Sequence, residues 1–137
     1  MSIHVRWDRK FEVGHPRIDF EHRIFLDLIA ELSRQAEGGT LPSRLAKTLC
    51  EIYKYADFHF VSEENLMEDI GYPDLAEHRQ QHEMLLAELR DFRAELDDGG
   101  RPPAKIVNFL FQWFALHTSR EDKRIADFIR ASNAQGA

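Results

Sequence analysis

The chain has 137 residues, a length typical of one domain with a core that is stable without disulfides. Hydrophobic residues make up 43% of it and the net charge is −6 with no basic cluster, which excludes a disordered chain and disfavours binding to nucleic acid or anionic membranes. The single cysteine excludes a disulfide framework and a Cys-rich zinc site, and neither a membrane span nor a signal peptide is recognisable, so we expect a cytoplasmic protein.

Four segments of helical length follow an N-terminal arm, residues 1–17, and are separated by turn signals at residues 38–42, 71–73 and 98–103. Their inward positions, spaced alternately by three and four residues, are Ile18, His22, Phe25, Ile29, Leu32 and Ala36; Leu45, Leu49, Ile52, Ala56, His59, Glu63, Leu66 and Ile70; Leu75, His78, His82, Leu85, Leu89, Phe92 and Leu96; and Ile106, Leu110, Trp113 and His117. This spacing is typical of helices packed side by side. We predict an all-α, up-down-up-down four-helix bundle over residues 1–137, capped by Trp7 and Phe11 of the arm and followed by a short helix at about 120–132.

Histidines are concentrated at these inward positions. Five of the seven histidines lie there together with Glu63, whereas His4 and His15 belong to the arm, where we expect them to be solvated. One buried histidine is usually a hydrogen-bonded core residue. Five of them with a carboxylate are costly to bury unless they are paired or bind metal.

The spacing along the helices favours one shared site. His59 and Glu63 are four residues apart, as are His78 and His82, so each pair projects from one helix face with Cβ atoms about 5–6 Å apart. Because neighbouring helices of the bundle alternate in direction, the starts of the first and third helices and the ends of the second and fourth share one end. The histidines are therefore predicted to converge at one level.

The donor set narrows the choice of metal. Nitrogen-rich ligation with carboxylates suits iron, and less often zinc, copper or nickel. The zinc-protease pattern is absent, since HRQQH lacks a glutamate after its first histidine, and the ferritin-like pattern is absent because the sole Glu-x-x-His is Glu12 to His15, just before Pro16. Five imidazoles also exceed the needs of one tetrahedral ion, so a histidine-rich binuclear site is predicted.

The chain resembles the hemerythrin family, in its bacterial single-domain form, over nearly its whole length. The matching stretches are VGHPRIDFEH, HFVSEENLM, GYPDLAEHRQQH and WFALHTSRED. The resemblance implies two oxo- or hydroxo-bridged non-haem irons, one bound by His78, His82 and His117, the other by His22 and His59, with Glu63 and Asp122 bridging both. Asp122 lies five residues after His117, about 140° around an ideal helix, so we expect a distortion or a helix end between Thr118 and Asp122.

The resemblance also implies reversible dioxygen binding at the iron with fewer ligands, as a carrier, store or delivery protein with a possible protein partner that receives the oxygen. An apolar pocket lined by Phe25, Phe60, Trp113 and Phe114 would protect it, although the same residues also fit an ordinary core. Thr118 stands where the family commonly has isoleucine. Its hydroxyl either faces the pocket, changing the autoxidation rate, or bonds a backbone carbonyl one turn back. Two alternatives stay open: an oxygen or redox sensor acting through a separate partner, and a di-iron peroxidase or nitric oxide-handling enzyme.

Overall fold

The computed structural model describes residues 5–136, and every regular element in that range is helical, which confirms the all-α prediction. His4 lies outside the described residues. The elements are η1 (Arg9–Phe11), a 3-10 turn in the arm, α1 (Pro16–Glu37), α2 (Pro42–Ile70), α3 (Leu75–Asp98), α4 (Pro103–Leu116), η2 (His117–Asp122), a π-helical stretch, and α5 (Lys123–Gly136).

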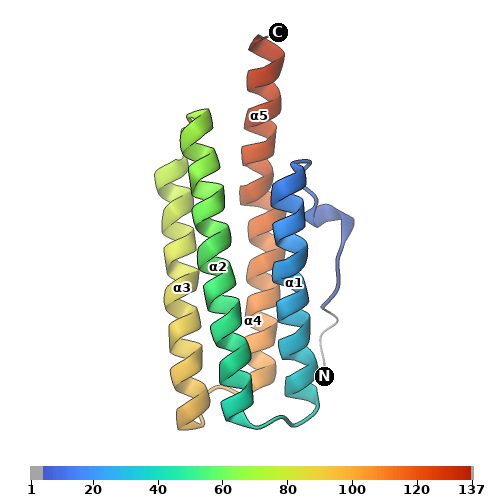
Figure 1. The fold of residues 1–137 in the computed structure, drawn as a ribbon, viewed down its shortest axis with the longest axis vertical. Helices are drawn as coiled ribbons and strands as arrows, with labels where there is room; N and C mark the ends of the chain where they lie inside the picture. The colour runs from blue at the N-terminus through green and yellow to red at the C-terminus, as the bar shows by residue number, and fades with distance from the viewer. Residues whose placement is uncertain (1–4, 137) are drawn as a thin grey trace.

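The helices alternate in direction around the bundle, as predicted (Figure 1). The predicted C-terminal helix is present as α5 and continues the axis of α4 through η2, so that α4, η2 and α5 form one long column that extends beyond the other helices (Figure 1). Because the column is unbroken, η2 lies inside the bundle.

Proline and glycine mark the helix boundaries. Pro16, Pro42 and Pro103 occupy first helical positions, where the missing N–H costs no hydrogen bond. Gly71 and Gly99 end α2 and α3 with φ of 67° each, a left-handed conformation that favours glycine. These residues fix where each helix turns back, and therefore which ends lie at the same level.

The core follows most of the predicted inward positions; Ala36 and Leu75 at helix ends are only partly buried, and two local shifts occur elsewhere. Near the end of α2, Leu66 and Ile70 were predicted to be buried, but both are only partly buried. Met67 is fully buried instead, because it packs against Tyr72 and Ile125 of α5. In α4, Phe114 is buried and Trp113 is partly exposed. Both shifts arise where helices contact the long fourth column.

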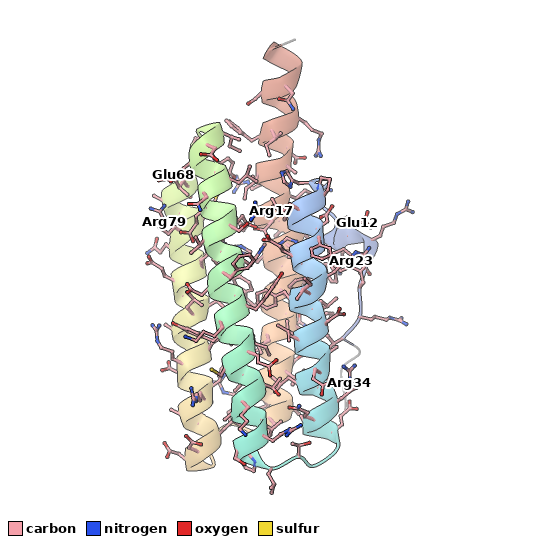
Figure 2. All side chains as sticks on the ribbon, in the orientation of Figure 1. Glu12, Arg17, Arg23, Arg34, Glu68 and Arg79 are labelled. Atoms are coloured by element: carbon pink, nitrogen blue, oxygen red, sulfur yellow. The ribbon has the colours of Figure 1, made fainter. Side chains whose placement is uncertain are left out.

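The arm was predicted to cap the bundle. In the structure it runs along the side of the bundle, next to α1 (Figure 1). Phe11 is buried in the main core, with its ring centroid 5.1 Å from that of Phe114. Trp7 is partly buried, and the Arg23 guanidinium lies 4.2 Å from its ring centroid. Arg23 also approaches Glu12 of the arm at 3.4 Å (Figure 2).

Two side chains tie the arm to the first turn of α1. Asp19 accepts hydrogen bonds from the backbone N–H groups of Val13 at 2.8 Å and Gly14 at 3.2 Å. His15, expected to be solvated, is partly buried, and its Nδ1 accepts from the N–H of Ile18 at 3.4 Å as the N-cap of α1. The end of the arm is thus held against α1 by specific hydrogen bonds.

Candidate metal centre

Seven side chains from all four columns meet inside the bundle. All seven are buried, with exposed fractions of 1–2% except for His117 at 6%. They are His22 on α1, His59 and Glu63 on α2, His78 and His82 on α3, and His117 and Asp122 on η2.

The π-helical stretch η2 explains how Asp122 reaches the site. Backbone bonds in a π-helix join residues five apart, so such residues lie above one another instead of on different faces. The Nε2 of His117 and the Oδ1 of Asp122 are accordingly 3.1 Å apart. The predicted distortion between Thr118 and Asp122 is therefore confirmed.

The hydroxyl groups of Thr118 and Ser119 in η2 donate to backbone carbonyls in the last turn of α4. Thr118 donates to the carbonyl of Phe114 at 2.8 Å, and Ser119 donates to the carbonyl of Ala115 at 2.6 Å. For Thr118 this is the second of the two predicted orientations, with its one hydroxyl proton committed to the helix one turn back.

The two oxygens of Glu63 face different groups of histidines. Oε1 lies 2.7 Å from the Nε2 of His78 and 3.2 Å from that of His82. Oε2 lies 3.4 Å from the Nε2 of His59 and 3.8 Å from that of His22. The carboxylate therefore spans the space between two histidine groups.

Asp122 repeats this arrangement from the opposite column. Its Oδ1 lies 3.0 Å from the Nε2 of His78 and 3.1 Å from that of His117, and its Oδ2 lies 2.9 Å from the Nε2 of His22. Two clusters result, each with donor atoms within 4.8 Å of one another. One contains Glu63, His78, His82, His117 and Asp122, and the other contains His22, His59, Glu63 and Asp122.

Several buried donor atoms of these clusters lie near charged or polar neighbours but make no hydrogen bond of normal geometry. They are both ring nitrogens of His22, Oε2 of Glu63 and both carboxylate oxygens of Asp122. Leaving buried polar atoms unpaired is costly, so such a concentration needs a ligand. Imidazole nitrogen with carboxylate oxygen is a donor set that suits iron, and the residues present fit such an ion.

The carboxylates of the centre remain ionised. Burial and repulsion by Asp122 raise the pKa of Glu63, but the facing imidazoles of His59, His78 and His82 together outweigh both and lower it below its usual range. Burial also raises the pKa of Asp122, while His117, His22 and His78 together lower it well below its usual range. Both groups are therefore available as anionic ligands.

A carboxylate outside the seven orients His59. Oε1 of Glu21 accepts from Nδ1 of His59 at 2.7 Å, which leaves Nε2 free to face the centre. Arg17 and Ser62 donate to the other oxygen of Glu21 at 3.1 and 3.2 Å. Burial raises the pKa of Glu21, but His59, Arg17 and Ser62 together bring it below its ordinary value.

Glu64 does the same for His82. Its Oε2 accepts from Nδ1 of His82 at 2.9 Å, and its Oε1 accepts from Arg79 at 3.0 Å. The orienting roles of Glu21 and Glu64 were not predicted from the sequence. Their signal was slight: each stands one position off the inward seam and next to a predicted ligand.

The expected pocket aromatics divide between the two clusters. Phe25 lies 6.5 Å from His59 and Phe114 lies 5.8 Å from His22, measured between ring centroids. Phe60 instead stacks on His82 at 3.9 Å, and Trp113 stacks on His117 at 4.3 Å. Phe25 and Phe114 thus border the cluster with two histidines, and Trp113 covers a histidine of the cluster with three. Phe60 borders both clusters, since its ring also lies 5.9 Å from that of His59.

A family model described as "Hemerythrin HHE cation binding domain" matches residues 13–129. The chain belongs to the hemerythrin family. It is 26% identical over 132 residues to a bacteriohemerythrin of Pseudomonas paraeruginosa, covering 96% of this chain and 86% of that one. It is 28% identical over 111 residues to a myohemerythrin of Riftia pachyptila, covering 81% of this chain and 82% of the other.

Solved structures agree with this membership. The fold matches a crystal structure of wild-type hemerythrin with a TM-score of 0.83 at 25% identity, covering 91% of this chain and 97% of the other. No helix within the described residues has the length and apolar character needed to span a bilayer. The hemerythrin fold and its buried donor cluster therefore occur together in this chain.

Proposed function

We propose that this hemerythrin holds two non-haem iron ions, bridged by Glu63 and Asp122, and binds dioxygen reversibly as a cytoplasmic carrier or store. One observation carries the proposal. Glu63 presents one oxygen to His78 and His82 and the other to His22 and His59, which is the arrangement that a carboxylate shared between two ions requires.

The donor count is unequal, and this favours one end for dioxygen. Three histidines accompany the carboxylates in one cluster and only two in the other, so an ion held by His22, His59 and the carboxylates would have fewer protein donors than its neighbour. Ferrous iron held there would supply the electrons that reversible dioxygen binding requires.

The protein's own contribution at this end is to exclude water and proton donors. Phe25 and Phe114 are buried to within 2% of full coverage and lie 5.7 Å apart between ring centroids. Two hydroxyl groups near this end donate elsewhere: Thr118 to the Phe114 carbonyl and Tyr55 to the Glu21 carbonyl at 2.9 Å. Because both of these protons are committed to carbonyl oxygens, neither hydroxyl is free to protonate and release reduced oxygen, which favours binding over turnover.

Metal analysis combined with absorption spectroscopy tests the proposal. We expect about two irons per chain, as the two clusters imply, and a coloured species formed by the reduced protein in air that bleaches under vacuum. One zinc per chain, or no metal, would reject the di-iron centre. One-way oxidation with peroxide turnover would reject reversible binding and favour an enzyme.

A further inference from the structure

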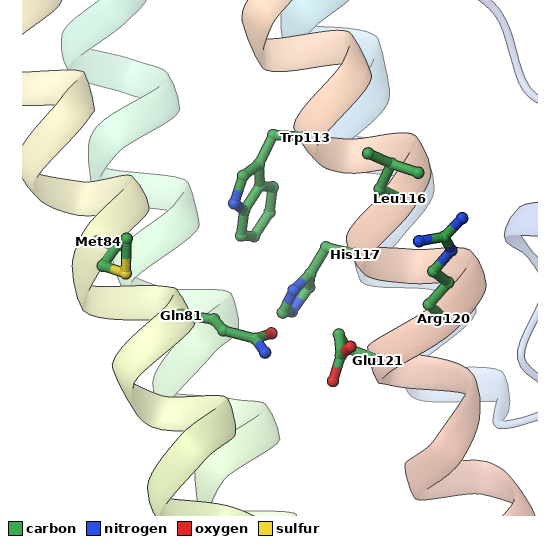
Figure 3. A pocket seen from close by; sticks show the side chains of 7 residues that line it. All are labelled: Gln81, Met84, Trp113, Leu116, His117, Arg120 and Glu121. Carbon is green, nitrogen blue, oxygen red and sulfur yellow. The ribbon is translucent and has the colours of Figure 1, made fainter.

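A hollow of about 270 Å³ lies between α3 and the junction of α4 with η2, and its lining includes His117 (Figure 3). Its volume is sufficient for several water molecules at about 30 Å³ each. His117 is also the most exposed of the seven clustered side chains, at 6%. The hollow therefore brings solvent next to one side chain of an otherwise enclosed centre.

Oxygen donors gather in this hollow without a role in the centre itself. Figure 3 shows the amide of Gln81, from α3, and the carboxylate of Glu121, from η2, next to each other on the same side of the His117 ring. Oε1 of Gln81 is buried and has no hydrogen-bond partner. Glu121 forms a long ion pair with Arg124 at 3.6 Å through one oxygen, and its partly exposed carboxylate has a second oxygen that can attract a cation.

The remaining wall adds a thioether and an aromatic ring beside His117. Met84 is 64% exposed and adds a thioether, and Trp113 stacks against the His117 ring. Arg120 also lines the hollow, but its guanidinium is directed away from His117 (Figure 3). The ligand types that face His117 are therefore carboxylate, amide oxygen and thioether, and the two oxygen types suit a hydrated ferrous ion.

We propose that this hollow is a port through which hydrated ferrous iron reaches and leaves the centre, with Glu121 and Gln81 as transient ligands that pass the ion to His117. The proposal rests on the proposed function, since it requires that the centre binds iron. It adds a second, weaker cation site that is distinct from the seven buried ligands.

A plug at the mouth tests the port. Met84→Trp introduces a large ring at an exposed position, and Ala87→Trp, exposed on the same helix, is the matched control. Ferrous uptake by the apoprotein and iron extraction by a chelator are timed anaerobically. A port predicts that the plug slows both rates by the same factor and leaves the equilibrium iron content unchanged, whereas the control matches wild type.

Different outcomes overturn different claims. Rates in Met84→Trp equal to those of wild type reject the port, as does faster extraction, which indicates a loosened bundle. Wild-type apoprotein that takes up no iron rejects the proposed function and the port together. Uptake of iron to the full content at rates insensitive to the plug rejects the port alone.

Removing the charge of Glu121 provides a second variant. Glu121→Gln keeps the shape of the side chain, so uptake is expected to fall by about tenfold, the lower end of electrostatic steering, and to lose part of its salt dependence. Glu83→Gln, an exposed acid on α3 outside the hollow, is the control. An unchanged uptake rate and salt dependence in Glu121→Gln contradict a capture role.

Discussion

Two of the clustered histidines use both ring nitrogens. Nε2 of His59 and of His82 faces the shared carboxylate, while Nδ1 donates to Glu21 or Glu64. The outer hydrogen bond fixes the ring orientation, so that Nε2 is the nitrogen facing the centre once the ring loses its second proton. Each of these histidines is consequently oriented by an acid that lies outside the seven clustered side chains.

Removing Glu21 tests this directly. Glu21→Ala leaves Nδ1 of His59 without its acceptor, so the affinity for iron beside His22 and His59 is expected to fall by about 10–100-fold. Competition with a chelator measures it as one weakened step in a two-step titration. Asp27→Ala, exposed on the same helix, serves as control, and two unchanged steps in Glu21→Ala would show that His59 needs no orienting acid.

Thr118 provides a test of the pocket's polarity. Because its hydroxyl proton is held by the Phe114 carbonyl at 2.8 Å, Thr118→Val is expected to keep the autoxidation rate of the oxygenated protein. The lost hydrogen bond costs about 1 kcal/mol in the free energy of unfolding. Absorption decay in air measures the first quantity and denaturant unfolding the second. A large change in autoxidation would mean that the hydroxyl turns toward the pocket.

At the scale of helices, the sequence predicts which residues lie at the same level along the bundle. It does not predict which side chains of neighbouring helices contact one another. Helical spacing placed His22, His59, Glu63 and their partners at one level because an inward stripe depends on one helix alone. Asp122 required the family resemblance, since a π-helical stretch breaks the period on which such patterns rely.

The hydrogen bonds of Glu21 and Glu64 and the course of the arm are set by contacts between elements, and the sequence alone does not predict them. Glu21 and Glu64 reach histidines 38 and 18 residues away, so their role depends on how far each helix is rotated against its neighbour. The course of the arm along α1 depends on hydrogen bonds to Asp19. In the sequence, Asp19 is recognisable only as an acidic residue in the first turn of a helix.

The anchoring of the arm gives a prediction at this scale. Asp19→Ala removes the acceptor of two backbone N–H groups, and the apoprotein is expected to lose about 1–2 kcal/mol in the free energy of unfolding. Limited proteolysis is expected to cut the arm faster, because its N–H groups are released. Glu37→Ala, exposed at the far end of α1, is the control, and equal cleavage of the two variants would contradict the anchor.

For the whole molecule, the main consequence is that a four-helix bundle carries a charged interior. Burial alone would lower the pKa of His59 and of His78, but facing carboxylates raise each from 6.5 to about 10. Without metal, the bundle therefore balances Glu63 and Asp122 with protonated histidines. The sign follows: a raised histidine pKa stabilises the apoprotein fully below pH 6.5, and this stabilisation is lost as pH rises toward about 10.

Iron reverses that dependence, because an imidazole binds metal only after losing its proton. Between pH 6.5 and about 10, binding is expected to release one proton each from His59 and His78, so the affinity for ferrous iron rises with pH while the stability of the apoprotein falls. Anaerobic calorimetry in buffers of different ionisation enthalpy counts the protons, with His15→Ala as control because His15 lies outside the centre. Binding that releases no protons at neutral pH would mean that the histidines are already neutral in the apoprotein, and that the carboxylates are balanced in some other way.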